Sequence, residues 1–143
     1  MRARLAALAL VLATTACQAA PEAKEAAADL EAGRAELVAH LSEHGALTTV
    51  DVRLVDEATA GRQVRIEAGT SAAPAERTEV LEELARAGWH TSAFVPTEVR
   101  VSLVASDGAT LDARDLGFAR RGADAAALFD RYGPPAADES WRP

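Results

Sequence analysis

The single cysteine of this 143-residue chain, Cys17, is the feature that most limits how the chain can fold. One thiol cannot form an internal disulfide, so side-chain packing alone must hold the folded part together. Aromatic residues make up only 4% of the chain, so this packing has to come mainly from alanine, valine and leucine. We therefore expect one small domain with an aliphatic core.

The residues before Cys17 have the composition of an export signal. Arg2 and Arg4 give a basic start, an apolar run occupies residues 5–13, and small residues lead to Cys17. The run is roughly half as long as the ~20 residues that a membrane-spanning helix needs. A basic start, a short apolar run and a small-residue exit are typical of a cleaved signal peptide. We therefore predict that residues 1–16 are removed on export.

Residues 12–17, with the sequence LATTAC, resemble the lipobox of bacterial lipoproteins. The resemblance implies that Cys17 receives a diacylglyceryl group and becomes the new N-terminus. The protein would then be anchored to the outer face of a bacterial membrane, or to a leaflet facing the periplasm, by fatty chains. Thr14 departs from the family, which usually has an aliphatic residue there. The alternative is an ordinary cleaved signal without a lipid.

The net charge limits the surfaces that this protein can bind. The formal charge is −7 at pH 7, and it becomes −9 when the signal with its two arginines is removed. Nucleic-acid binding needs a basic surface, so this charge argues against a nucleic-acid partner. It argues equally against adsorption to anionic lipid. Attachment to a membrane would therefore depend on the lipid at Cys17.

Hydrophobic periodicity predicts one domain over residues 25–135, between a short tether (17–24) and a flexible tail (136–143). Apolar residues three and four positions apart predict three helices, over about residues 22–44, 75–87 and 122–132.

Alternation of apolar and polar residues predicts two β-hairpins. The first pairs residues 47–56 with 62–68, and the second pairs residues 98–105 with 109–114. Asp107-Gly108 is a strong hairpin turn signal between the strands of the second pair.

These elements predict an α+β two-layer sandwich, with an antiparallel sheet of about four strands and helices on one face. A shift of about 47 residues aligns the first hairpin and its helix with the second hairpin and its helix. This alignment indicates either a duplicated ββα unit or the chance likeness of two ordinary units.

Three histidines are candidates for metal binding or catalysis. His40 and His44 are four residues apart on the first predicted helix, a spacing that suits two ligands of one metal. His90, beside Trp89, suits either a loop in a cleft or a capped helix end with a packed tryptophan. No third ligand is evident, and two solvated histidines near a helix C-terminus are the alternative. The sequence contains no catalytic or cofactor-binding motif, so it predicts no cofactor and favours a protein that is not an enzyme.

Arginines recur on the outward phase of the predicted strands, one on each: Arg53, Arg65, Arg100 and Arg114. A sheet face with one arginine per strand would suit an anionic ligand or an acidic partner, because guanidinium groups make planar bidentate contacts. The alternative is a solvated face on which these arginines pair across strands with Asp51, Glu67, Glu98 and Asp112.

The order helix, strand, strand, helix, strand over residues 26–104 resembles the BON domain of bacterial envelope proteins. The strand of residues 61–69 (GRQVRIEAG), the helix of residues 75–88 and the strand of residues 98–103 carry the resemblance. It implies an envelope-associated module that binds phospholipid or another wall component. The long connector of residues 89–96 and the second hairpin and helix depart from that family.

The sequence therefore predicts a lipid-anchored cell-envelope protein. Its exported domain would be a non-enzymatic binding module for a protein partner or a wall component. The alternative is a small envelope enzyme or metal-binding protein that uses the histidines.

Overall fold

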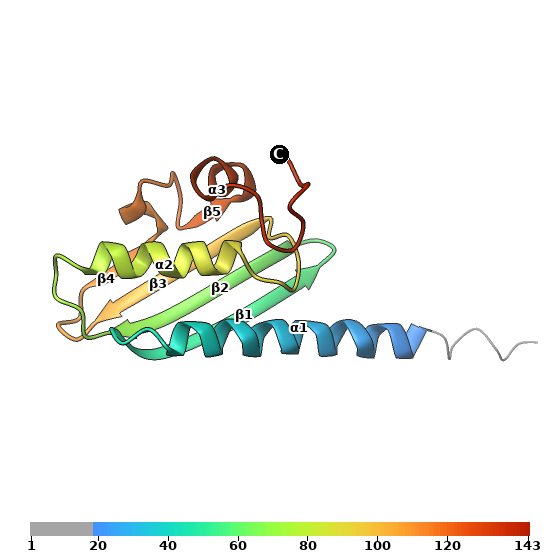
Figure 1. The fold of residues 1–143 in the computed structure, drawn as a ribbon, viewed down its shortest axis with the longest axis horizontal. Coiled ribbons are helices and arrows are strands. Elements are labelled where there is room, and N and C mark those ends of the chain that lie inside the picture. Colours follow the sequence, from blue (N-terminus) through green and yellow to red (C-terminus); the bar gives the residue numbers. More distant parts are fainter. Residues whose placement is uncertain (1–18) are drawn as a thin grey trace, which may run out of the picture.

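A computed structural model of the chain describes residues 19–143 (Figure 1). The predicted signal and Cys17 lie outside the described residues. The elements follow one another in this order: α1 (Ala19–Ser42), β1 (Leu47–Glu57), β2 (Gly61–Thr70), α2 (Arg77–Trp89), β3 (Glu98–Ala105), β4 (Thr110–Asp112), the 3-10 helix η1 (Ala113–Leu116), β5 (Gly122–Asp124) and α3 (Ala125–Tyr132).

Five strands form one mixed sheet in the order β1-β2-β3-β4, and β5 also pairs with β3. β1 and β2 are antiparallel, with Val52 opposite Ile66. β2 and β3 are parallel, with Ile66 beside Val101. β4 pairs with the second half of β3 and β5 with its first half, both antiparallel. The α+β class is thus confirmed.

The prediction that the whole sheet is antiparallel is wrong at the β2–β3 pair. The chain passes through α2 between these strands. A helical crossover of this length brings the chain back to the end of the sheet at which β2 begins, so β3 runs in the same direction as β2. Alternation of apolar and polar residues is the same in parallel and antiparallel strands, so it does not reveal strand direction.

This topology does not fit a duplicated ββα unit. If the second ββα unit were a rotated copy of the first, the parallel direction of β2 and β3 would require a rotation axis in the plane of the sheet. Such a rotation would place the second helix on the opposite face of the sheet from the first. Instead, α3 packs beside α2, and Leu128 of α3 belongs to the same core as the α2 residues. The two halves therefore share a pattern of apolar residues but are not copies of one structural unit.

All three helices lie on one face of the sheet (Figure 1), and the core lies between the two layers. Alternate residues of β2 and β3 point into this core because successive side chains of a strand face opposite sides. The main core residues are at most 5% exposed: Leu37, Leu41, Val64, Ile66, Leu81, Leu84, Val99, Val101, Leu103 and Leu128. No helix of the described part covers the other face.

Helix α1 extends beyond the domain at its N-terminal end (Figure 1). It begins at Ala19, within the segment expected to be a tether, and the side chains of residues 22–29 are all exposed. In residues 19–143 no helix has the length and apolarity needed to cross a membrane.

The C-terminal residues pack on the helix layer, although a flexible tail was expected for residues 136–143. The Trp141 ring lies edge-on to the Trp89 ring, 5.7 Å between centroids, and 5.9 Å from the Phe129 ring. Trp89 Nε1–H also donates to the Gly133 carbonyl at 2.8 Å. These contacts join the last residues to the ends of α2 and α3.

Substitution of Gly88 tests how closely α2 packs on the sheet. An added Cβ would lie 2.8 Å from Val99 Cγ1 and 3.2 Å from Ile66 Cδ1, and both side chains are buried. Overpacking a core site typically costs about 1–3 kcal/mol, so we expect Gly88→Ala to lower the free energy of unfolding by that amount. Urea denaturation measures the change. Gly45→Ala, where a Cβ meets nothing within 4 Å, serves as the control and should be close to neutral.

Candidate functional site

The uncovered sheet face carries a row of three arginines. Arg53 on β1 lies opposite Arg65 on β2, and Arg65 lies beside Arg100 on β3. All three side chains are exposed. Like charges in directly opposite positions weaken a sheet. The direct pairing of these arginines therefore does not stabilise the sheet.

Part of this row lines an open groove of about 470 Å³. Arg65 and Arg100 lie in its floor, and Arg114 and Arg121 line it from the segment that follows β4. The other polar residues of the lining are Glu67, Ser102, Thr110 and Asp112, and Ile66 and Val101 complete it. The groove thus gathers three of the four predicted arginines. Arg53 is in the row but does not line the groove, and Arg114 lies in η1, not on a strand.

Sequence reasoning missed Arg121. It precedes β5, a strand of three residues that the sequence analysis assigned to the last helix. The pairing of β5 with β3 places Gly122 opposite Arg100, and this brings Arg121 to the groove. A three-residue strand has too few positions for its alternation to be recognised.

Three of the four predicted arginines pair with a carboxylate two residues earlier in the chain. Arg53 Nη2 is 3.7 Å from Asp51 Oδ2, and Arg114 Nη2 is 2.7 Å from Asp112 Oδ2. Arg100 pairs with Glu98 in the same way. The acids therefore neutralise arginines of their own segment, whereas the expected solvated face had them pairing across strands.

Arg65 is the exception, because the residue two positions earlier is Gln63. Arg65 Nε and Nη2 donate to Gln63 Oε1 at 3.3 and 2.8 Å. No carboxylate among residues 19–143 lies within ion-pair distance of Arg65. The groove thus contains a guanidinium that forms no ion pair within the described part of the chain, although the Glu67 carboxylate also lines the groove. The repeated acid–x–Arg spacing, with glutamine in one place, is the sequence signal that singles it out.

Asp112 holds the two arginines at the other side of the groove. Its carboxylate accepts from Arg114 Nε and Nη2 at 2.9 and 2.7 Å, and Arg121 Nε lies 3.4 Å away. It also accepts from the Arg114 backbone N–H and so caps η1. The hydrogen bonds from Arg114, with the charge of Arg121, lower the pKa of Asp112 to about 2. The carboxylate is therefore ionised at neutral pH.

The histidines do not converge on a common site. His40 Nε2 lies 3.5 Å from Glu83 on α2, whereas His44 Nδ1 accepts from the Ala46 N–H at 3.4 Å. Within the described part of the chain, no three histidine, cysteine or acidic side chains are placed to hold a metal ion.

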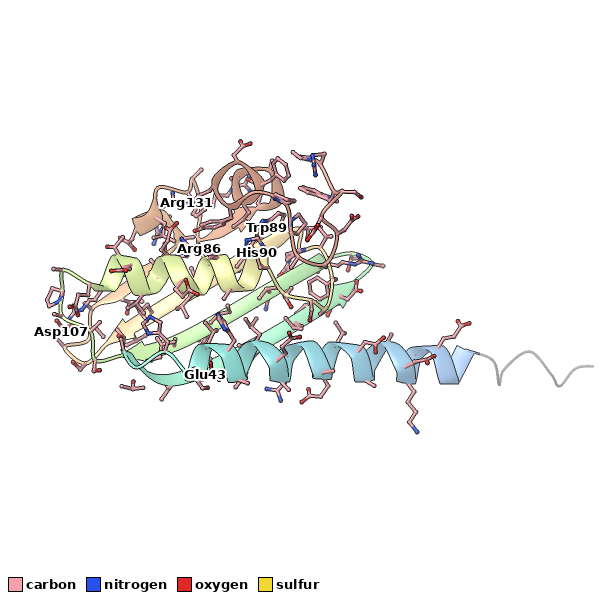
Figure 2. All side chains as sticks on the ribbon, in the orientation of Figure 1. Glu43, Arg86, Trp89, His90, Asp107 and Arg131 are labelled. Carbon is pink, nitrogen blue, oxygen red and sulfur yellow. The ribbon has the colours of Figure 1, made fainter. Side chains whose placement is uncertain are left out.

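His40 and His90 line a second cleft, of about 290 Å³, between α1 and the end of α2. Figure 2 shows His90 next to Trp89 at the end of α2. Burial, together with the charge of Arg86, lowers the pKa of His90. The Ser92 hydroxyl in this cleft donates to Glu36 Oε2 at 2.5 Å and not to a histidine. Ser92 is therefore not paired with a histidine, which is the usual activating partner of a nucleophilic serine.

Arg77 is a buried arginine that the sequence analysis did not single out. It is 8% exposed, and its Nε donates to the Ala72 carbonyl at 3.2 Å. Its Nη2 donates to Asp107 Oδ2 at 2.8 Å, in the β3–β4 turn labelled in Figure 2. Arg77 thus fastens the start of α2 to this turn. Its role is structural, and it does not face the groove.

No family model matches the chain, and no curated protein or solved structure matches it either. The order α1, β1, β2, α2, β3 is the element order on which the resemblance to BON domains rests. Membership of that family stays a prediction.

The titration of Asp112 tests the geometry of the groove. Carboxyl-carbon NMR should give Asp112 a pKa of about 2, and Arg114→Ala should raise it toward the ordinary value of 3.8. Because the pKa is lowered by folding, the ionised carboxylate stabilises the fold above pH 3.8, and this contribution is lost as the pH falls toward 2. Arg121→Ala should raise the pKa less, since Arg114 supplies the hydrogen bonds. Equal shifts in the two variants would contradict the described contacts.

Proposed function

We propose that this chain is a lipid-anchored cell-envelope protein whose exported domain is a non-enzymatic binding module. Its open sheet face would bind anionic groups of an envelope component or a protein partner. The observation that carries the proposal is the groove with Arg65, which hydrogen-bonds to Gln63 and has no carboxylate of residues 19–143 within ion-pair distance.

The groove suits phosphate or carboxylate groups. Arg65 and Arg100 occupy directly paired positions on neighbouring strands, which lie about 4.8 Å apart in a sheet. Two guanidinium groups at this spacing can contact one anionic group together, and guanidinium matches phosphate and carboxylate in bidentate geometry. The Ser102 and Thr110 hydroxyls add hydrogen-bond donors at the same place.

The same groups favour binding over catalysis. Acid–base catalysis at neutral pH works best with a group whose pKa is near 7. The Asp112 carboxylate, with a pKa of about 2, is a poor proton acceptor at that pH. The alternative, a small envelope enzyme or metal-binding protein, rests on the cleft that His40 and His90 share.

The anchor is the second part of the proposal. The lipobox-like segment supports it, and so does the start of α1 two residues after Cys17. The exposed residues 22–29 of α1 would span about 12 Å at 1.5 Å per residue. A helix of that length, projecting from the domain, would hold the groove away from the membrane surface.

The intact mass of the protein from its native membrane fraction tests the anchor. We expect a mass that lacks residues 1–16 and includes a diacylglyceryl group. The Cys17→Ser variant should lack the lipid mass and leave the membrane fraction. An unlipidated wild-type protein in the soluble fraction would refute the anchor, and it would leave the proposal for the groove untouched.

Binding of tripolyphosphate, followed by backbone NMR shifts, tests the groove. We expect the largest shifts in β2 and β3 around Arg65. Arg65→Gln should weaken binding about tenfold, since a charge-assisted hydrogen bond contributes about 1.5–3 kcal/mol. Asp112→Asn should strengthen binding, because it releases Arg114 and Arg121 while an amide oxygen can still cap η1.

Arg34→Gln is the matched control for this experiment. Arg34 lies on α1 and pairs with Glu31, away from the groove, and the substitution removes the same charge. It should leave tripolyphosphate binding unchanged. Equal losses in the Arg34 and Arg65 variants would show that the probe responds to net charge, and the proposed site would then be wrong.

A further inference from the structure

Glu67 is a second charged residue of the groove that forms no ion pair within residues 19–143. It lies on β2 two residues after Arg65, and its exposed side chain lines the same groove. Residues two positions apart in a strand face the same side of the sheet. One strand therefore presents to the groove a cation and an anion that have no ionic partner in this part of the chain.

β2 interrupts the acid–x–Arg spacing on both sides of this pair. Gln63 stands where Arg65 would have its acid, and Gly69 stands where Glu67 would have its arginine. The guanidinium of Arg65 leans toward Gln63, to which Nε and Nη2 both donate, and so away from Glu67. The two opposite charges are thus held apart although they lie on one face of one strand.

We propose that the groove binds an α-amino acid group, with its carboxylate on Arg65 and its ammonium on Glu67. The site is the groove of the proposed function, and the inference rests on that function. Such a group occurs in a free amino acid and at the end of an amide-linked side chain of a larger molecule. The two sources present the same chemistry to the groove.

The spacing of the two residues suits a ligand whose charges lie close together. Alternate residues of a strand are about 6.7 Å apart, and the lean of Arg65 toward Gln63 widens the gap between the charged groups. The nitrogen and the carboxylate carbon of an α-amino acid lie about 2.5 Å apart. With a charge-assisted hydrogen bond of about 2.8 Å at each end, this group bridges protein atoms about 8 Å apart.

Neighbouring side chains extend both halves of the site. Arg100 lies beside Arg65 on β3 and offers the carboxylate a second guanidinium. Ser102 lies beside Glu67 on the same strand, so its hydroxyl oxygen can accept a hydrogen bond from the ammonium. Asp51 lies opposite Glu67 on β1 and adds negative charge there. One part of the groove therefore attracts a carboxylate, and the adjoining part attracts an ammonium.

The net charge of the chain favours a zwitterion over a simple anion. A chain with a formal charge of −7 repels anions at long range, whereas a ligand without net charge meets no such repulsion. At short range Glu67 repels a phosphate or a lone carboxylate, and it attracts an ammonium. Glu67 thus distinguishes an α-amino acid group from a simple anion.

Three lysine derivatives that share one arm test this ligand class by NMR titration. Nε-acetyllysine carries the complete α-amino acid group, Nα,Nε-diacetyllysine keeps only the carboxylate, and the amide of Nε-acetyllysine keeps only the ammonium. We expect Nε-acetyllysine to bind about fivefold more tightly than the other two, with the largest shifts around Arg65 and Glu67. Alanine, which lacks the arm, tells the two sources apart. It should equal Nε-acetyllysine if the groove takes a free amino acid, and bind more weakly if the group belongs to a larger molecule.

Glu67→Gln should change the binding of two probes in opposite directions. It removes the partner of the ammonium, so Nε-acetyllysine should bind about fivefold more weakly and lose its advantage over the diacetyl form. It also removes a repelling charge, so tripolyphosphate should bind more tightly. A loss of structure would weaken both.

Glu79→Gln is the matched control. Glu79 is exposed on α2, on the other side of the sheet from the groove, and the substitution removes the same charge. It should leave the preference for Nε-acetyllysine unchanged.

The two probes separate the failure of this inference from the failure of the proposed function. Tripolyphosphate binding at Arg65 without a preference for Nε-acetyllysine would overturn the inference and leave the proposed function standing. A Glu67→Gln variant that keeps the full preference would do the same. If neither tripolyphosphate nor Nε-acetyllysine shifted the signals of β2 and β3, the groove would not be a binding site, and the proposed function would fail with it.

Discussion

The parallel pairing of β2 with β3 beneath α2 is the constraint on which the rest of the structure depends. One face of this pair supplies the centre of the core, where Val64, Ile66 and Val99 lie under α2. Gly88 lets the helix approach these side chains closely. The other face of the same pair sets Arg65 beside Arg100. The core and the groove are therefore two sides of one strand pairing, and neither can shift in register without the other.

The sequence predicts the elements of this pairing better than their arrangement. β3 has the predicted bounds, and the helix predicted over residues 75–87 is α2, displaced by two residues at each end. Apolar alternation correctly separated the buried side chains of β2 and β3 from the exposed arginines. The direction of β3 relative to β2 leaves no trace in that alternation, because direction depends on where the crossover places the chain.

The groove was predictable in part. The four arginines could be assigned to one face, but only the folded chain brings Arg121 to them and moves Arg53 to the side. The partners of the arginines follow a local rule, with the acid two residues earlier on the same segment. A local rule of this kind can be read in a sequence once the strands are known. Arg65 departs from the rule because Gln63 stands two residues before it. It therefore has no acidic partner on its own strand, although its position in the sheet matches those of Arg53 and Arg100.

The crossover through α2 also affects how the chain reaches its folded state. The β1–β2 hairpin joins residues that are close in the sequence, whereas the β2–β3 pair has to wait until α2 has formed and the chain has returned. Long-range parallel pairing of this kind is intrinsically slow. Until it forms, β2 exposes a second free edge in addition to that of β1, and unpaired edges promote aggregation. The hairpin is thus most vulnerable in the interval before β3 arrives, when each of its sides can still capture a strand from another chain.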